Sequence, residues 1–167
     1  MIEIPYRRQE AVNYAKKWAY GRNPNYYNFD QLGGDCTNFI SQCLYQGSKV
    51  MNYAKDTGWY YLTANNKAPG WTGVEFFYQF LTKNRGVGPY AKEILMTDPL
   101  LQVGDIAQLA FEEGKFAHTV MIVKIENQNN IHQIYTASHT YDTFEKPLGS
   151  YATHQIRFLH IQAIRKS

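Results

Sequence analysis

Cys36 is the residue of this sequence best placed for nucleophilic chemistry. It follows Gly33-Gly34-Asp35 and opens a segment in which apolar residues recur with helical spacing at positions 39, 40, 43 and 44. Asp35 is a typical N-cap residue, so we expect Cys36 in the first helical turn, where the helix dipole and unpaired backbone N–H groups stabilise a thiolate. The pattern predicts a cysteine nucleophile at a helix N-terminus. The alternative for any free thiol is a small buried hydrophobic residue.

Cys43 is the second cysteine of the chain and lies seven positions further along the same helix. At a rise of about 1.5 Å per residue the two Cα atoms would be about 10 Å apart, too far for an unstrained disulfide. Its apolar neighbours predict that Cys43 packs in the core. Because no zinc-binding spacing of cysteine and histidine occurs, we expect two free thiols, no metal and no cofactor.

A cysteine nucleophile needs a base that takes its proton and returns it to the leaving group, a role that suits histidine near neutral pH. His118 is the preferred candidate because it opens the most apolar run of the chain, residues 119–123. His139 is the expected third member. A symmetric two-residue turn at positions 128–129 would place it opposite His118, with the Cβ atoms about 5 Å apart, so that one ring can orient the other. A turn one residue longer or shorter would move His139 to the other face, and Asp142 is then the reserve orienting residue.

The remaining histidines are expected to be surface residues or strand residues with satisfied hydrogen bonds: His132, His154 and His160.

Length and composition restrict the class of protein. A chain of 167 residues is long enough for a sizeable core and is most simply one domain, residues 1–167. The net charge of +3 comes from scattered Lys and Arg, which argues against a nucleic-acid-binding surface. No run of about 18 apolar residues is present, so no membrane span is expected. Residues 1–5 are not a signal peptide, but a leader could have been removed, so the compartment and the oligomeric state stay open.

The elements that must position Cys36 and the histidines divide into a helical first half and a strand-rich second half. Helices are expected over residues 6–19 and 36–47 and, after a capping box from Thr72 to Glu75, to about residue 84. Strands are expected over residues 106–111, 117–125, 131–139 and 156–164. Short turns between strands indicate an antiparallel meander. We therefore expect an α+β fold with N-terminal helices packed on a C-terminal antiparallel sheet.

The segment from Asp35 to Gln42, DCTNFISQ, resembles the nucleophile helix of bacterial papain-like cell-wall hydrolases, the NlpC-type and CHAP enzymes. More specifically, residues 6–161 resemble the putative amidase domain family of that superfamily. The matching features are the Tyr- and Asn-rich loop before Gly33-Gly34-Asp35-Cys36, Trp71-Thr72, Gly104-Asp105, Ala117-His118-Thr119 and His139-Thr140-Tyr141-Asp142. NlpC-type enzymes usually have Ser-Gly after the cysteine, whereas this chain has Thr37-Asn38, so their particular substrate is not carried over.

The resemblance implies a papain-like fold and a thiol-dependent amide hydrolase that uses a Cys36–His118–His139 triad. The substrates of such an enzyme would be peptide or peptidoglycan amide bonds. The resemblance also favours the bacterial cell envelope, the spore or secretion as the location of the protein. Backbone N–H groups at the start of the Cys36 helix would hold the oxyanion.

Four aromatic residues are candidates for contact with the substrate. Tyr26 and Tyr27 precede the nucleophile and could contribute to the oxyanion site, with simple loop packing as the alternative. Trp59 and Trp71 could line a groove, because flat aromatic rings bind sugars and extended peptides; packing in the core is the alternative.

Two other functions fit the same residues. Transglutaminase-type acyl transfer would favour Asp142 over His139 and would need an acceptor amine in place of water. A non-catalytic module could hold a peptide or glycan in an aromatic cleft, although binding alone needs no Cys–His pair. Iodoacetamide labelling of Cys36 across pH separates binding from catalysis.

Overall fold

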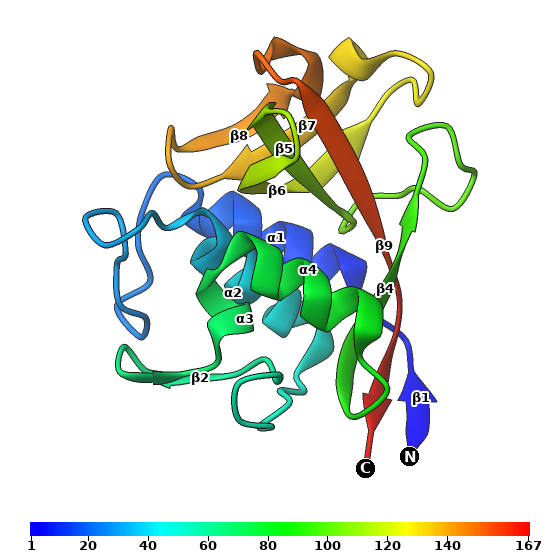
Figure 1. Ribbon diagram of the computed structural model, residues 1–167. Coiled ribbons are helices and arrows are strands. Elements are labelled where there is room, and N and C mark those ends of the chain that lie inside the picture. Colours follow the sequence, from blue (N-terminus) through cyan, green and yellow to red (C-terminus); the bar gives the residue numbers. More distant parts are fainter.

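The computed structural model describes residues 1–167 and has an α+β architecture, in which one large antiparallel sheet packs against helices (Figure 1). The helices are α1 (Arg8–Trp18), α2 (Cys36–Ser48), α3 (Pro69–Thr72) and α4 (Val74–Lys83), with short 3-10 turns at η1 (Ile131–Gln133) and η2 (Leu148–Ser150). The strands of the large sheet are β1 (Ile2–Ile4), β4 (Gly88–Ile94), β5 (Ile106–Glu112), β6 (Lys115–Ile125), β7 (Ile134–Ser138), β8 (Thr143–Pro147) and β9 (Gln155–Lys166). A separate hairpin joins β2 (Tyr61–Thr63) to β3 (Asn66–Lys67). None of the helices is both long and apolar enough to cross a membrane.

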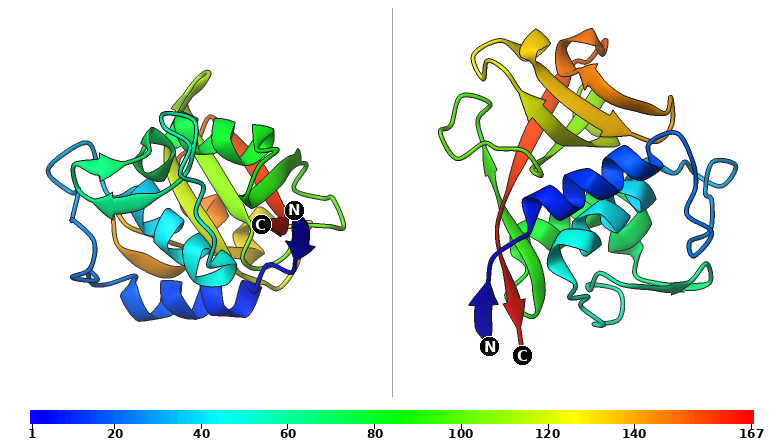
Figure 2. Two further views of the ribbon diagram at one scale, coloured as in Figure 1. Left: turned by 90° about the horizontal axis from the view of Figure 1, so that it is seen from below. Right: turned by 180° about the vertical axis from the view of Figure 1, so that it is seen from behind.

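The strand order β1-β9-β5-β6-β7-β8, with β4 on the other edge of β9, confirms the predicted antiparallel meander for the central strands. The long strand β9 pairs first with β5 and then with β1, so the two chain termini lie side by side (Figure 2). The sequence pattern missed β1, β4 and β8. β1 and β4 pair with the longer strand β9, and β8 pairs with β7, a strand of equal length that carries the stronger pattern.

The two faces of the sheet bury different side chains. Met121 and Ile106 point toward the helices and join their core, whereas Val120 and Ile122 join a second core on the opposite face. This is the alternation expected along a strand, in which successive side chains point to opposite faces. The face on which each residue of β6 lies therefore decides whether it can reach α2.

Two expected helix boundaries differ from those observed. Gly47 does not end α2: the helix continues to Ser48 and ends at Lys49, which has a left-handed φ of 56°. Gly47 is instead a point of close approach, because a Cβ there would lie 2.4 Å from the Tyr6 ring. The predicted capping box from Thr72 to Glu75 is also wrong, because α4 begins at Val74 after Gly73 and no side chain caps the helix.

Candidate active site

Cys36 is the first residue of α2, as predicted, and Asp35 occupies the N-cap position. The Asp35 side chain does not cap the helix, however. Its carboxylate accepts hydrogen bonds from the Phe29 backbone N–H (2.8 Å) and from the Asn38 side-chain amide (2.9 Å). The carboxylate therefore ties the loop before α2 to the first turn of the helix.

The Cys36 thiol is buried, with 8% of the residue exposed. Burial raises the pKa of the thiol, and the lowering effects of the Thr119 backbone amide and the Thr37 hydroxyl offset this only in part. The expectation of a thiolate is thus wrong for this conformation, because desolvation outweighs the field of the helix N-terminus. At rest Cys36 is a thiol.

His118 lies on the face of the sheet opposite α2. It pairs with Leu109, whose side chain belongs to the second core, whereas the next residue, Thr119, faces the helices and bonds the Thr37 hydroxyl (2.9 Å). The His118 ring lies beside that of Tyr151, with centroids 5.8 Å apart. Its Nε2 atom is buried and has no hydrogen-bond partner.

The His118 ring is neutral at physiological pH. Burial lowers its pKa to about 4, and the nearby Lys146 charge acts in the same direction. A neutral imidazole with an unpartnered nitrogen can accept a proton.

No hydrogen bond joins the Cys36 sulfur to the His118 ring, so the predicted dyad is not formed in this conformation. The two residues are nevertheless neighbours in the fold, because the residues that follow them, Thr37 and Thr119, bond each other through their hydroxyls (2.9 Å). A β-bulge lies at this point: Leu109 pairs with His118 while Ala110 pairs with Phe116, which leaves Ala117 as the extra residue. Bulges of this kind change the direction of a side chain and are frequent beside active sites.

His139 does not contact His118, and the predicted hairpin register is wrong. Met121 lies opposite Ala137, a register that, if continued, pairs His139 with Thr119 and sends its ring to the helix side of the sheet. The symmetric turn is replaced by the 3-10 turn η1, and a bulge interrupts the pairing between Ile122 and Lys124. This shift of one residue moves the side chain to the other face.

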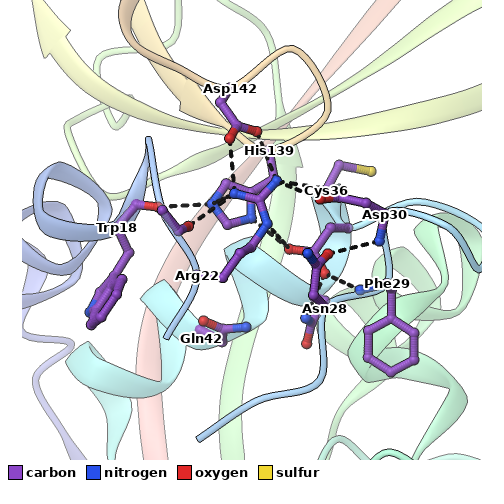
Figure 3. A network of polar contacts seen from close by, with 12 residues as sticks. Trp18, Arg22, Asn28, Phe29, Asp30, Cys36, Gln42, His139 and Asp142 are labelled. Atoms are coloured by element: carbon purple, nitrogen blue, oxygen red, sulfur yellow. Dashed lines mark hydrogen bonds and ion pairs between the residues drawn. The ribbon is translucent and has the colours of Figure 1, made fainter. Parts of the chain in front are cut away.

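Both ring nitrogens of His139 are already engaged (Figure 3). Nδ1 lies 2.6 Å from an Asp35 carboxylate oxygen, and Nε2 lies 2.8 Å from the Trp18 carbonyl oxygen. The ring stacks on Phe39 with centroids 3.8 Å apart, and the Cys36 sulfur points away from it. His139 thus holds Asp35 rather than orienting His118.

Arg22 completes this network, which sequence reasoning missed. Its guanidinium donates hydrogen bonds to Asp30 and Asp142 (2.9 Å each) and lies 3.5 Å from Asp35. Asp142 is therefore paired with Arg22, and its reserve role as an orienting residue for His118 is not supported by contact. Burial would raise the pKa of Asp35, but hydrogen bonds from His139, Asn38 and Phe29 outweigh it and leave the pKa below its ordinary value. The one signal available was Asp35 itself, which we interpreted only as a helix cap.

The aromatic candidates pack against the protein. Trp59 and Trp71 are fully buried, and their indole N–H groups donate to Ser41 Oγ and Asn38 Oδ1 (3.0 Å each), so neither lines a groove. Tyr26 packs against Tyr61 and stacks on Trp71. Tyr27 is half exposed, and its ring lies edge-on against Phe29. For Trp59 and Trp71 the packing alternative is correct, whereas a role of Tyr26 and Tyr27 in substrate contact stays a prediction.

A cavity of about 360 Å³ borders the site, with His118, Thr140 and Tyr151 among its lining residues. The Thr140 hydroxyl lies 3.8 Å from the position that a Cβ of Gly34 would occupy, so the cavity also adjoins the loop that leads to Cys36. A larger cavity of about 630 Å³ lies between residues 52–58 and 76–86, and no cysteine or histidine lines it. We therefore assign the candidate site to the smaller cavity.

Comparison with known proteins identifies the family to which this chain belongs. Residues 5–161 match the family described as "Putative amidase domain", and the chain belongs to this family. The chain is also 31% identical over 163 residues to the uncharacterized protein YhbB of Bacillus subtilis (strain 168). That alignment covers 93% of this chain but only 50% of YhbB, so the chain spans about half the length of this relative. No solved structure matches the chain.

Cys43 provides an internal control for the thiol chemistry. It is fully buried and free, as predicted, and belongs to the core between the helices and the sheet. We expect Cys43→Ala to lower the free energy of unfolding by about 1 kcal/mol and to leave any catalytic turnover unchanged, because only packing is lost. Urea unfolding and an activity assay measure the two effects; a stable but inactive variant would show that Cys43 is the functional thiol.

The neutral His118 predicts a pH dependence of stability. Between pH 4 and its ordinary pKa of about 6.5, the unfolded chain binds a proton at this residue that the folded chain does not. The free energy of unfolding should therefore rise with pH across this window, by on the order of 3 kcal/mol at most. The depressed pKa of Asp35 acts in a separate window, where stability falls as pH drops below 3.8.

Urea unfolding at several pH values tests this dependence, with His118→Gln expected to flatten the slope. His154→Gln is the matched control, because His154 is exposed and should leave the slope as it is. An equal slope in wild type and His118→Gln would contradict a buried, neutral His118.

Proposed function

We propose that this protein is a cysteine-dependent amide hydrolase, with Cys36 as nucleophile and His118 as general base and then general acid. One observation carries the proposal. A neutral histidine with a buried, unpartnered Nε2 directly precedes Thr119, whose hydroxyl bonds that of Thr37, the residue that follows Cys36 at the N-terminus of α2. Membership of the amidase family favours amide bonds as the target.

The first step requires the His118 ring to turn toward the thiol. The bulge at Ala117 supports such a movement, since a shift of the bulge by one residue would send the His118 side chain to the face on which Cys36 lies. Catalytic hydrogen bonds are often absent from ligand-free structures and form only with the substrate. We therefore take the observed conformation as the resting state.

In the second step His118 accepts the thiol proton as the Cys36 sulfur attacks the carbonyl carbon of the amide. Negative charge then develops on the carbonyl oxygen. The unpaired N–H groups of the first turn of α2 are suited to hold it, because the first amides of a helix have no partner within the helix.

The third step breaks the C–N bond. The His118 imidazolium gives its proton to the leaving nitrogen, and the acyl group stays on Cys36 as a thioester. Water, deprotonated by His118, attacks the thioester, releases the carboxylic acid and restores the thiol.

The network of His139, Asp35 and Arg22 acts as a positioning device in this proposal. Asp35 is held from four sides: by the His139 ring, the Asn38 amide, the Phe29 backbone and the Arg22 charge. Because Asp35 directly precedes Cys36, these bonds fix the direction in which the first amides of α2 point. The order of helix, nucleophile and following sheet also supports a papain-like arrangement over residues 1–167.

The test is a screen of peptide libraries and a peptidoglycan digest with products identified by mass spectrometry. Hydrolysis predicts pairs of products whose combined mass exceeds that of the substrate by one water. Products in which the acyl part is joined to an added amine would instead support acyl transfer. Absence of cleavage in every pool would contradict the proposed hydrolase.

A further inference from the structure

The cavity beside His118 has an unusual lining. Its walls are formed by aromatic and small side chains together with the hydroxyl residues Thr140 and Ser150. Lys146 is the single cationic residue among them, and no carboxylate lines the cavity. The cavity is therefore apolar for the most part, with one positive charge.

Lys146 has no anionic partner, unlike the arginines that pair with carboxylates elsewhere in the fold, such as Arg8 with Asp105 and Arg157 with Glu75. Its ammonium instead lies over the Tyr151 ring, 4.3 Å from the centroid. Ser138 Oγ lies 3.3 Å from the Tyr151 hydroxyl and helps to fix that ring. A half-buried cation held on an aromatic face is available to bind an anion.

We propose that Lys146 binds a carboxylate on the amine side of the substrate, so that the preferred substrates are amides whose leaving amine carries a carboxylate. This inference rests on the proposed function and adds a substrate class to it. The carboxylate can be the free C-terminus of a peptide or an acidic side chain, because both present the same group to the ammonium.

The assignment of the carboxylate to the amine side of the substrate follows from the role of His118. His118 gives its proton to the leaving nitrogen, and the cavity reaches from His118 to Thr140, beside the loop that leads to Cys36, so the amine part of the substrate has space there whichever way the ring is turned. The Lys146 ammonium lies within about 10 Å of the His118 ring, because the two groups are 4.3 and 5.8 Å from the same Tyr151 centroid.

The size of the cavity fits a short amine part. Two residues of extended chain span at most about 7 Å, so a carboxylate on the first or second residue after the scissile bond can reach the flexible lysine. A volume of about 360 Å³ is near the lower end of the range of about 300 to 1,000 Å³ found for ligand pockets. One or two residues would fill it.

The test measures binding to the Cys36→Ala variant by isothermal titration calorimetry, so that no turnover interferes. Three ligands are compared: N-acetyl-trialanine with a free carboxylate, its C-terminal amide, and the same amide with glutamate as third residue. We expect at least one carboxylate ligand to bind about tenfold more tightly than the neutral amide. The two carboxylate ligands separate a C-terminal from a side-chain carboxylate.

Lys146→Met in the same background keeps the alkyl stem and should abolish this preference, whereas Lys146→Arg should retain it. Circular dichroism confirms that each variant is folded. Equal affinities for all three ligands, no binding of any of them, or an unchanged preference in Lys146→Met would each overturn the inference.

The two proposals can fail separately. Turnover of amides with a carboxylate on the amine side at a rate that Lys146→Met leaves unchanged would overturn the role of Lys146 and leave the hydrolase intact. Lysine-dependent binding of carboxylates without turnover in any pool would overturn the hydrolase and leave the binding site.

Discussion

Replacing Cys36 with alanine is expected to abolish turnover of every amide that the wild-type protein cleaves. The nucleophile forms the covalent bond to the acyl group, and no other thiol can replace it, because Cys43 is fully buried in the core. The fold should persist, since alanine suits the first turn of a helix and the hydrogen bonds of Asp35 do not involve the sulfur. Product formation by mass spectrometry and thermal unfolding measure the two properties on the same sample.

The informative comparison is with Cys43→Ala, which should lose stability but not activity. Full turnover in Cys36→Ala would remove the basis of the cysteine mechanism. Loss of activity together with loss of the fold would point instead to a structural role for the Cys36 side chain.

Replacing His118 with glutamine is expected to lower kcat by about 10²- to 10⁴-fold, the range typical of a general acid–base catalyst. Glutamine has a similar size and can hydrogen-bond, but it cannot take up and return a proton. Because the pKa of His118 is about 4, the wild-type rate should fall below that pH as the base becomes protonated. Steady-state kinetics between pH 3.5 and 8 would show this acidic limb, a decrease in rate that corresponds to the uptake of about one proton per site. The variant should not show the acidic limb.

His139→Gln separates catalysis from positioning. It breaks the bond to Asp35, so we expect a less stable protein whose residual activity keeps the acidic limb set by His118. A variant of His139 that loses this limb while His118→Gln keeps it would show that we have assigned the base to the wrong histidine.

The sequence predicted the elements well where one strong pattern governs them. The apolar spacing after Cys36 predicted α2 from its first residue, and the β-rich runs predicted β5, β6, β7 and β9. In each case the residues that define the element also form its buried face, so local pattern and packing agree.

The site could be predicted only in part, because it depends on contacts that no local pattern encodes. The pairing of β6 with β7 is set by η1 and a bulge, and a shift of one residue moved His139 from His118 to Asp35. Asp35 is of a residue type typical of helix caps, yet its carboxylate bonds a histidine more than 100 positions away. The state of the Cys36 thiol depends on its burial, at a place where Thr37 bonds Thr119, 82 positions further along the chain.

The most direct test of the account is the detection of an acyl group on Cys36. Wild-type protein is mixed with the substrate pool that gives cleavage, quenched in acid within seconds, digested and analysed by mass spectrometry. We predict that the peptide containing Cys36 gains the mass of the acyl part of the substrate, and that His118→Gln slows its accumulation. Cleavage without any such adduct, or an acyl group on a different residue, would contradict Cys36 as the nucleophile.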